Sequence, residues 1–276
     1  MPFATSPDGL RIRYAESGAG PPIILITHVG ASALGWHREF IELLSRDFRV
    51  IVFDNRGTGE SDKPLGPFTV LDMAKDALAV LGHLGISRAH VLGLSMGGLV
   101  AQELTLHAPE RVDKLILVST LAGWANATPT RARASEALAA GADPALTPRE
   151  AARKWLPAYY SAAYLSEHEA DVLEQMARMM ARTSPRTLEL QGEAIGIFDT
   201  YGRLAEIRRP VLVIHGNADD MVPIENGRVL AERIPAARMA IVQGAGHIPT
   251  TEQPQVVATL VRNFAGVPGK TAGSTA

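Results

Sequence analysis

A serine between glycines is the residue whose setting most clearly indicates chemistry. The pentapeptide Gly93-Leu94-Ser95-Met96-Gly97 follows a short apolar run and precedes a helical pattern. On such a sharp turn the serine needs a strained backbone, which is tolerable only if the residues two positions away lack bulky side chains. Its hydroxyl is then exposed as a nucleophile, and the Met96 amide at the helix start can stabilise an oxyanion. The alternative is a packing turn with an incidental serine.

A nucleophilic serine needs a base within hydrogen-bond reach, because its free hydroxyl reacts poorly near neutral pH. His247 is the best candidate, since it follows Gly244-Ala245-Gly246 in a loop after the last apolar run. An unperturbed histidine titrates near ~6.5 and only its neutral form is a base, so we expect activity to rise through roughly pH 6 to 7.5. Other histidines occupy positions that favour packing or surface roles: His37, His83, His90, His107, His168 and His215.

An acidic residue is needed to orient the base, and two neighbouring aspartates compete for that role. Asp219 and Asp220 lie in a turn between an apolar run that ends before His215 and a helical pattern that follows Pro223. A carboxylate there could hold the imidazole in the right tautomer and stabilise its charged form. Either aspartate could instead be a helix cap or an ordinary turn residue.

Short apolar runs alternate with longer helical patterns along the chain. This alternation is typical of a mostly parallel sheet with crossover helices. The expected buried strands are Ile23 to Ile26, Val50 to Phe53, His90 to Leu94, Lys114 to Val118, Val211 to Ile214 and Arg238 to Val242. An alternating segment from Leu10 to Ala15 predicts one arm of an antiparallel hairpin at the sheet edge. The predicted sheet is therefore mixed.

The spacing of the strands changes after Ser119, because the next strand-like run begins only at Val211. The residues between them predict helices instead. Helix starts are expected at Thr147, Ser166 and Ser184. The expected division is a core at 1–120 and 206–265, a helical lid at 121–205 and a disordered tail at 266–276.

Composition limits the classes of function. The chain has 276 residues, of which 46% are hydrophobic and 20% charged, and a formal net charge of −2. This weak charge argues against nucleic-acid and anionic-membrane partners, which normally need a strongly basic surface. No run approaches the ~20 apolar residues of a membrane span, and the first residues lack the layout of a signal peptide. Without cysteine the chain has no disulfide or thiolate site, and we expect a cytoplasmic protein with no metal and no cofactor.

The nucleophile, acid and base together resemble the α/β-hydrolase family. Ser95, Asp219 and His247 follow one another in the chain order typical of this fold. The spacing from the preceding glycine turn favours Asp219 over its neighbour within this resemblance. The segment from Phe53 to Asp62 resembles the family's turn after the fourth strand, and we interpret it as structural. The resemblance spans nearly the whole chain and implies a mostly parallel eight-stranded sheet, flanked by helices, with a helical lid after the sixth strand.

The loop after the expected third strand departs from the family pattern. Members usually carry His-Gly-X there, and X donates the second oxyanion amide. This chain has Ile26-Thr27-His28-Val29-Gly30. Alignment on the downstream residues makes Val29 the donor, which we favour, whereas alignment on His28 makes Gly30 the donor. In the first case His28 borders the site, where it either contacts the substrate or fills space that glycine usually leaves open.

The resemblance implies acyl transfer through a covalent intermediate on Ser95, with a small-molecule ester or lactone as substrate. Specificity is expected to depend on the lid. Its aromatic candidates for the pocket are Trp124, Trp155, Tyr159 and Tyr160. The lid also carries an apolar stripe that favours packing on the body over lining a pocket, made of Val172, Leu173, Met176, Met179 and Met180.

Carboxylic-ester hydrolysis is the function that we favour from the sequence. The chain is also similar to enol-lactone hydrolases and to carbon–carbon-bond hydrolases of aromatic breakdown, although the tryptophan that often follows the final histidine of the latter is absent. A cofactor-free haloperoxidase or perhydrolase activity would be a side reaction of the same site. From another class, a non-hydrolytic ligand-binding receptor would not need the three residues. Ser95 argues against epoxide and haloalkane hydrolases, which use an aspartate nucleophile.

Overall fold

The apolar runs form the strands of one eight-stranded sheet, in the order β1-β2-β4-β3-β5-β6-β7-β8. The computed structural model describes residues 2–235 and 237–266. The strands are β1 (Phe3–Thr5), β2 (Arg11–Ser17), β3 (Pro22–Ile26), β4 (Arg49–Phe53), β5 (Ala89–Leu94), β6 (Val112–Val118), β7 (Val211–Gly216) and β8 (Ala237–Val242). β2 pairs antiparallel with β1 and with β4, and the other neighbours are parallel, so the prediction of a mixed sheet with an edge hairpin is confirmed.

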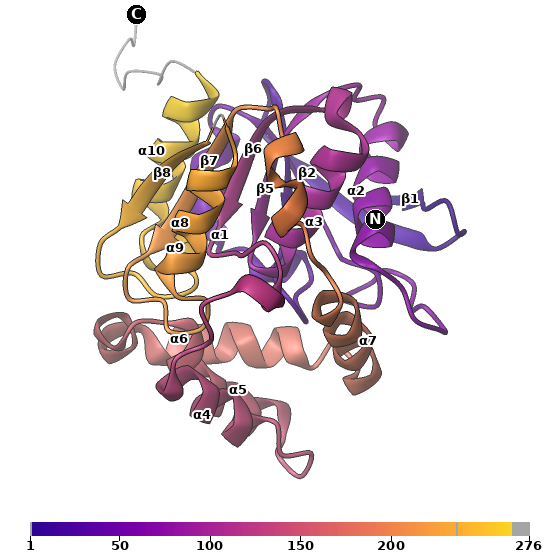
Figure 1. Cartoon of the computed structure of the whole chain (residues 1–276). Coiled ribbons are helices and arrows are strands. Elements are labelled where there is room, and N and C mark those ends of the chain that lie inside the picture. Colours follow the sequence, from indigo (N-terminus) through magenta and orange to yellow (C-terminus); the bar gives the residue numbers. More distant parts are fainter. Residues whose placement is uncertain (1, 236, 267–276) are drawn as a thin grey trace, which may run out of the picture.

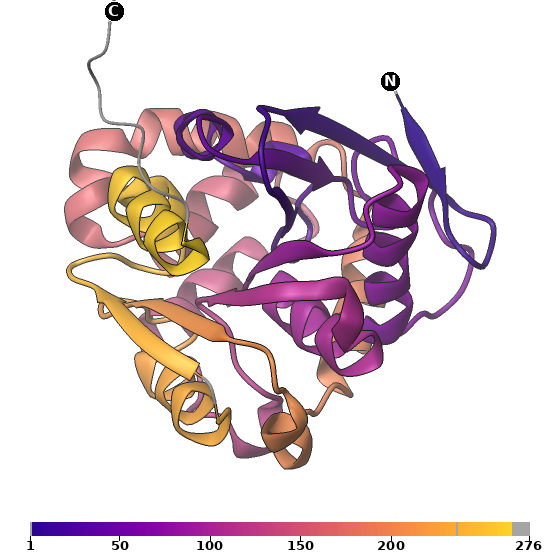
Figure 2. The same cartoon turned by 90° about the horizontal axis from the view of Figure 1, so that it is seen from above.

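Helices cover both faces of the sheet (Figure 2). One face carries α2 (Val70–His83), α3 (Met96–His107) and α8 (Ile224–Arg233), and the other carries α1 (Arg38–Ser45) and α10 (Pro254–Ala265). Because successive residues of a strand point to opposite faces, Ile24 and Ile26 join the first core and Ile23 and Leu25 join the second. This double burial explains why the strands read as continuous apolar runs.

Shorter elements complete the connections. They are the four-residue helix α9 (Pro249–Glu252) and the 3₁₀ turns η1 (Ala33–Gly35), η2 (Pro109–Arg111), η3 (Trp124–Asn126) and η4 (Tyr201–Glu206). Gly266 ends α10 in a left-handed conformation, and the rest of the predicted tail lies outside the described residues.

A helical insertion (residues 121–205) separates β6 from β7 and lies at one end of the sheet (Figure 1). Its helices are α4 (Ala132–Gly141), α5 (Pro148–Tyr159), α6 (Ala162–Met180) and α7 (Pro185–Gly196). Thr147 and Ser184 cap α5 and α7, which confirms two of the predicted starts. The predicted start at Ser166 is wrong, because the Ser161 hydroxyl accepts from Tyr164 N and begins α6 earlier. Ser166 lies inside that helix, and its hydroxyl donates to the carbonyl of Ala163.

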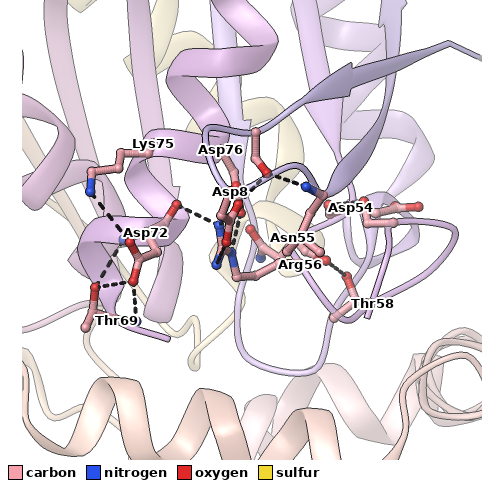
Figure 3. Close-up of polar contacts among 12 residues, drawn as sticks. Asp8, Asp54, Asn55, Arg56, Thr58, Thr69, Asp72, Lys75 and Asp76 are labelled. Carbon is pink, nitrogen blue, oxygen red and sulfur yellow. Dashed lines mark hydrogen bonds and ion pairs between the residues drawn. The ribbon is translucent and has the colours of Figure 1, made fainter. Parts of the chain in front are cut away.

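Arg56 lies in the turn that follows β4 and connects this turn to α2 and to the edge hairpin (Figure 3). Its guanidinium donates to the two carboxylate oxygens of Asp76 in α2 at 2.7 and 2.8 Å. It also donates to Asp8 beside the edge hairpin at 3.1 Å and to the carbonyl of Asp72 at 3.3 Å. Arg56 and Asp76 are both buried, so this turn holds the scaffold together, in agreement with its interpretation as structural.

Candidate active site

Ser95 occupies the turn between β5 and α3 in a backbone conformation that few side chains adopt, with φ 55° and ψ −119°. The neighbouring glycines are required for space. A Cβ on Gly93 would stand 2.1 Å from the carbonyl oxygen of Gly97, and a Cβ on Gly97 would stand 1.9 Å from that of Ile26. The close approach of α3 to β3 and β5 therefore explains the glycines on both sides of the serine.

Loops at the carboxyl ends of β5, β7 and β8 bring Ser95, Asp219 and His247 together. Ser95 Oγ lies 3.0 Å from His247 Nε2, and His247 Nδ1 lies 2.9 Å from Asp219 Oδ2. Because an ionised carboxylate only accepts, Nδ1 carries the imidazole hydrogen and Nε2 is the acceptor for the serine hydroxyl. In this tautomer the imidazole can take a proton from an attacking serine.

The Asp219 carboxylate is buried and surrounded by hydrogen-bond donors. Oδ1 accepts from the backbone N–H of Met221 at 3.0 Å and of Val222 at 2.9 Å. Oδ2 lies 2.9 Å from His247 Nδ1 and 3.3 Å from His215 Nε2. Burial raises the pKa of Asp219, but the adjacent His247 and the hydrogen bonds from both histidines outweigh burial and lower it to about 2. Asp219 is therefore ionised across the neutral pH range.

His215 is a second imidazole partner of Asp219, although its place at a strand end predicted only a packing role. Its Nε2 lies 2.7 Å from the carbonyl oxygen of Val222, so Nε2 carries the hydrogen and shares it between that carbonyl and the carboxylate. His215 is fully buried and is the second-last residue of β7. The signal in the sequence is its position four residues before Asp219, across one tight turn.

Asp220 contacts the helical insertion instead of His247. Its carboxylate lies 3.3 Å from Arg133 Nη1 and 3.7 Å from Arg131 Nε. Its carbonyl oxygen accepts from the Arg131 N–H at 2.8 Å. The two adjacent aspartates thus have separate partners, and the carboxylate beside the imidazole belongs to Asp219.

The loop that carries His247 is bonded to the junction between α5 and α6. The backbone N–H of His247 donates to the carbonyl of Tyr159 at 3.0 Å. Glu252 accepts from Gly246 N at 2.9 Å, from Ser161 N at 3.2 Å and from Ser161 Oγ at 2.6 Å. Burial raises the pKa of Glu252. The helical insertion therefore holds the backbone on which the imidazole stands, a connection that no local sequence pattern indicated.

On the loops beside Ser95, the backbone N–H groups of Val29 and Met96 have no partner within the described chain. Met96 is the first residue of α3, where no carbonyl one turn earlier is available. The alternative donor, Gly30 N, donates at 2.8 Å to Gln191 Oε1 on α7. Of the two candidates in the loop after β3, Val29 is thus the one with a free N–H.

His28 is buried beside Tyr159, whose ring also contacts that of His247. The ring centroids are 5.6 Å apart for the first pair and 5.9 Å apart for the second. Burial, together with the nearby His247, lowers the pKa of His28 to about 4, so its imidazole is neutral near pH 7. His28 Nδ1 lies 3.1 Å from the carbonyl oxygen of Val29 and donates to it. Burial likewise raises the pKa of Tyr159 to about 12.

Of the two tryptophans proposed for the pocket, one packs inside the helical insertion instead. Trp155 Nε1 donates to the carbonyl of Leu138 at 3.0 Å, which packs its ring between α5 and α4. Trp124 begins η3, and 42% of its surface is exposed. Trp155 therefore belongs to the internal packing of the helical insertion, whereas the role of Trp124 stays a prediction.

The described residues contain no group of three His, Cys, Asp or Glu side chains arranged to hold a metal ion. None of their helices combines the length and the apolar character needed to cross a bilayer.

A family model described as "alpha/beta hydrolase fold" matches residues 21–254, a span that contains all the loops described above. The chain belongs to the α/β-hydrolase family. Membership of this family makes it a hydrolase. The eight-stranded, mostly parallel sheet with helices on both faces confirms the predicted fold.

Similar α/β hydrolases span almost the same length. A protein of Azorhizobium caulinodans named "Putative carbamate hydrolase RutD" is 35% identical, over 96% of this chain and 98% of its own. The 3-oxoadipate enol-lactonase 2 of Acinetobacter baylyi is 31% identical, over 88% of this chain and 89% of its own. Among solved structures, the enol-lactonase of Burkholderia xenovorans LB400 is 28% identical with a TM-score of 0.83, covering 96% of this chain and all of that one.

Proposed function

We propose that this α/β hydrolase cleaves a carboxylic ester through an acyl-enzyme intermediate on Ser95. The observation that carries the proposal is the unbroken path of hydrogen bonds from Ser95 Oγ to His247 Nε2 at 3.0 Å and from His247 Nδ1 to Asp219 Oδ2 at 2.9 Å. This path supplies a nucleophile, a base and a charge that stabilises the protonated base. We assign these roles to the three residues in that order.

The proposed reaction has two halves. In the first, Ser95 Oγ attacks the substrate carbonyl while His247 Nε2 takes the hydroxyl proton, and the alcohol leaves with the proton that His247 returns. In the second, water attacks the acyl-enzyme, and His247 again takes and returns one proton, which releases the acid and restores Ser95. Asp219 stays ionised in both halves because its pKa is about 2.

We assign the oxyanion to the backbone N–H groups of Met96 and Val29. Both are free to donate, and Met96 adds the positive end of the α3 dipole. His28 is proposed as a wall of the pocket, because its ring lies against Tyr159, which in turn contacts His247. A neutral His28 leaves no fixed positive charge there, which suits an uncharged acyl group.

The substrate class is proposed as a small ester or lactone, since a lactone is an internal ester and two relatives are named enol-lactonases. A carbamate is the second candidate, because the RutD relative is similar along nearly its whole length and serine can attack a carbamate carbonyl by the same steps. We further propose that residues 121–205 act as the lid of a core formed by 1–120 and 206–265.

Labelling with a fluorophosphonate probe tests the proposed nucleophile whatever the natural substrate is. We expect labelling of the native chain and none of Ser95→Ala. Ser119→Ala is the matched control, because Ser119 is also a buried serine with positive φ at the end of a neighbouring strand. Failure of the native chain to label, or equal labelling of Ser95→Ala, would remove the basis of the proposal.

A substrate panel separates the candidate classes. It would compare p-nitrophenyl esters of increasing acyl length, an enol lactone and an aryl carbamate, each with native protein and Ser95→Ala. We expect the highest kcat/KM among the esters and lactones. Turnover of the carbamate alone would favour the second candidate.

A further inference from the structure

The loop after β3 receives hydrogen bonds from distant residues of the helical insertion. Gly30, at φ +70°, donates its N–H to Gln191 Oε1 at 2.8 Å and accepts at its carbonyl from Thr183 Oγ1 at 2.8 Å. These partners are 161 and 153 residues away in the chain. Both polar groups of this glycine are therefore satisfied by α7 and the segment just before it.

The helix α7, which supplies the Gln191 bond, is anchored to the body at a second point. Thr187, one turn before Gln191 in α7, donates its hydroxyl to the carbonyl of Gly57 at 3.1 Å. Gly57 lies in the turn after β4, which Arg56 joins to α2. The position of α7 is thus set by a second contact with the body in addition to the contact with the loop after β3.

Only one of the two polar groups of the Gln191 side-chain amide has a hydrogen-bond partner among the described residues. It is fully buried, and its Nε2 has no partner among the described residues, although buried amides normally bond through both groups. An apolar side chain of similar shape would bring no unpaired donor to this place. What the glutamine contributes is its oxygen, and that oxygen contacts Gly30 N.

The bond from Gly30 N to Gln191 holds one end of the Val29–Gly30 peptide group. The carbonyl end of this peptide accepts from His28 Nδ1 at 3.1 Å, and its N–H end donates to Gln191. Two bonds at opposite ends of one planar group fix its orientation, and this restricts the rotation of Val29. The N–H of Val29 stands on the other side of that rotation, in the preceding peptide, so these two bonds restrain its direction through the Val29 backbone.

We propose that Gln191, assisted by Thr183, is a positioning residue that aims the Val29 N–H at the oxyanion. This inference rests on the proposed serine hydrolase mechanism and extends it. It assigns α7 a part in transition-state stabilisation in addition to any part in covering the substrate. It also explains why Gly30, the other candidate, does not serve as the donor.

Two substitutions test the inference by removing each bond with little change of shape, Gln191→Met and Thr183→Val. Removal of an oxyanion donor costs about 100- to 1,000-fold in kcat. Misplacement of a donor should cost less, and we expect Gln191→Met to lower kcat by about 10- to 100-fold. KM should change by less than about twofold, because the ground-state carbonyl depends little on this donor. Thr183→Val should show a smaller loss of the same kind.

Matched variants separate positioning from general damage. Gln175→Met removes another hydrogen bond between the helical insertion and the body, from Gln175 Nε2 to the carbonyl of Leu34, and should leave kcat unchanged. Thr183→Ser keeps the hydroxyl and should restore most of the activity that Thr183→Val loses. Equal kcat in native protein, Gln191→Met and Thr183→Val would overturn the inference. So would an equal loss in Gln175→Met, or a loss that appears only in KM or in Tm.

Amide exchange measured by NMR tests the contact without reference to activity. The Gly30 N–H should exchange slowly in native protein and at least about tenfold faster in Gln191→Met, with Gln175→Met unchanged. Unaltered exchange at Gly30 would overturn the inference even if the enzyme is active. A native chain that neither labels nor hydrolyses any substrate would instead defeat the proposed function, while the exchange data would still report on the contact.

Discussion

Two buried carboxylates have different hydrogen-bond partners: an arginine for Asp76, and two histidines with two backbone N–H groups for Asp219. Asp76 in α2 is bonded by the guanidinium of Arg56 at 2.7 and 2.8 Å, within the cluster of Figure 3. The donors to Asp219 are two imidazoles and two backbone N–H groups. Burial raises the pKa of Asp76 to about 6 despite the arginine, whereas the pKa of Asp219 falls to about 2.

The partners explain which carboxylate can assist a proton transfer by stabilising a charged partner. Arginine keeps its proton in proteins, so Arg56 can fix the position of Asp76 but cannot exchange charge with it. Imidazole gains and loses a proton near neutral pH, so in the proposed mechanism the charge of Asp219 acts when His247 becomes protonated. A buried acidic residue thus belongs to the scaffold or to the chemistry according to whether its partner can titrate.

The largest expected effect is on catalysis and comes from Asp219→Asn. An asparagine can hold the imidazole in the wrong tautomer, and we expect kcat to fall about 10⁴-fold, equivalent to about 5.5 kcal/mol. Steady-state kinetics on an activated ester measure this. Asp220→Asn is the control, and its kcat should change by less than about threefold. A larger loss in Asp220→Asn than in Asp219→Asn would show that the acid was assigned wrongly.

The next effect is on stability and comes from Arg56→Met. Removal of the cation leaves Asp76 buried without its charged partner, which should lower the free energy of unfolding by about 3–5 kcal/mol. Denaturant unfolding measures the loss, and kcat per folded molecule should stay within about twofold. The double variant Arg56→Met/Asp76→Leu should recover most of the stability. If kcat falls as far as in Asp219→Asn, the contrast between scaffold and chemistry breaks down.

His28 extends the comparison to a buried base. Its pKa of about 4 in the folded protein lies below the ~6.5 of an exposed histidine, so the unfolded chain binds this proton more readily. Stability should therefore fall as the pH drops from about 6.5 to 4, by about 3 kcal/mol from this residue. Denaturant unfolding of native protein and His28→Gln at both pH values isolates the contribution of His28 to the free energy of unfolding. Equal pH dependence of the two proteins would contradict the lowered pKa.

The smallest effect is expected at Asp8, the exposed partner of Arg56. Asp8 also pairs with Arg56, at 3.1 Å, but 52% of its side chain is exposed. Solvent screens such a pair, so Asp8→Asn should lower the free energy of unfolding by less than about 1 kcal/mol. Measurement beside Arg56→Met gives the ratio of the two losses. A ratio near one would mean that burial does not decide the strength of these pairs.

The sequence predicted those features that depend on local pattern. The central strands were located to within a few residues, for example β7 at Val211–Gly216, because burial on both faces makes them apolar throughout. The turn at Ser95 was recognisable because a backbone collision dictates its glycines. The start of α6 was predicted wrongly, because two serines carry similar capping signals and only the fold selects Ser161.

Features that depend on contacts between distant segments could not be predicted. The residues alone left Asp219 and Asp220 open, and only the family resemblance favoured Asp219, because the exact turn decides which of them meets the N–H groups of Met221 and Val222. The roles of Glu252 and Gln191 arise from contacts across 91 and 161 residues of chain, for which no local periodicity exists.

The bonds between the α5–α6 junction and the histidine loop have a consequence for engineering by segment exchange. A chimera that replaced residues 121–205 with the equivalent segment of a relative would replace the residues whose backbone carbonyl accepts from His247 N and whose N–H and hydroxyl donate to Glu252. The graft would therefore alter the support of the His247 backbone along with the helical insertion itself. Transplanted segments should therefore keep the backbone of the α5–α6 junction in place and a serine at position 161, or the recipient loop from Gly246 to Glu252 should be exchanged with them.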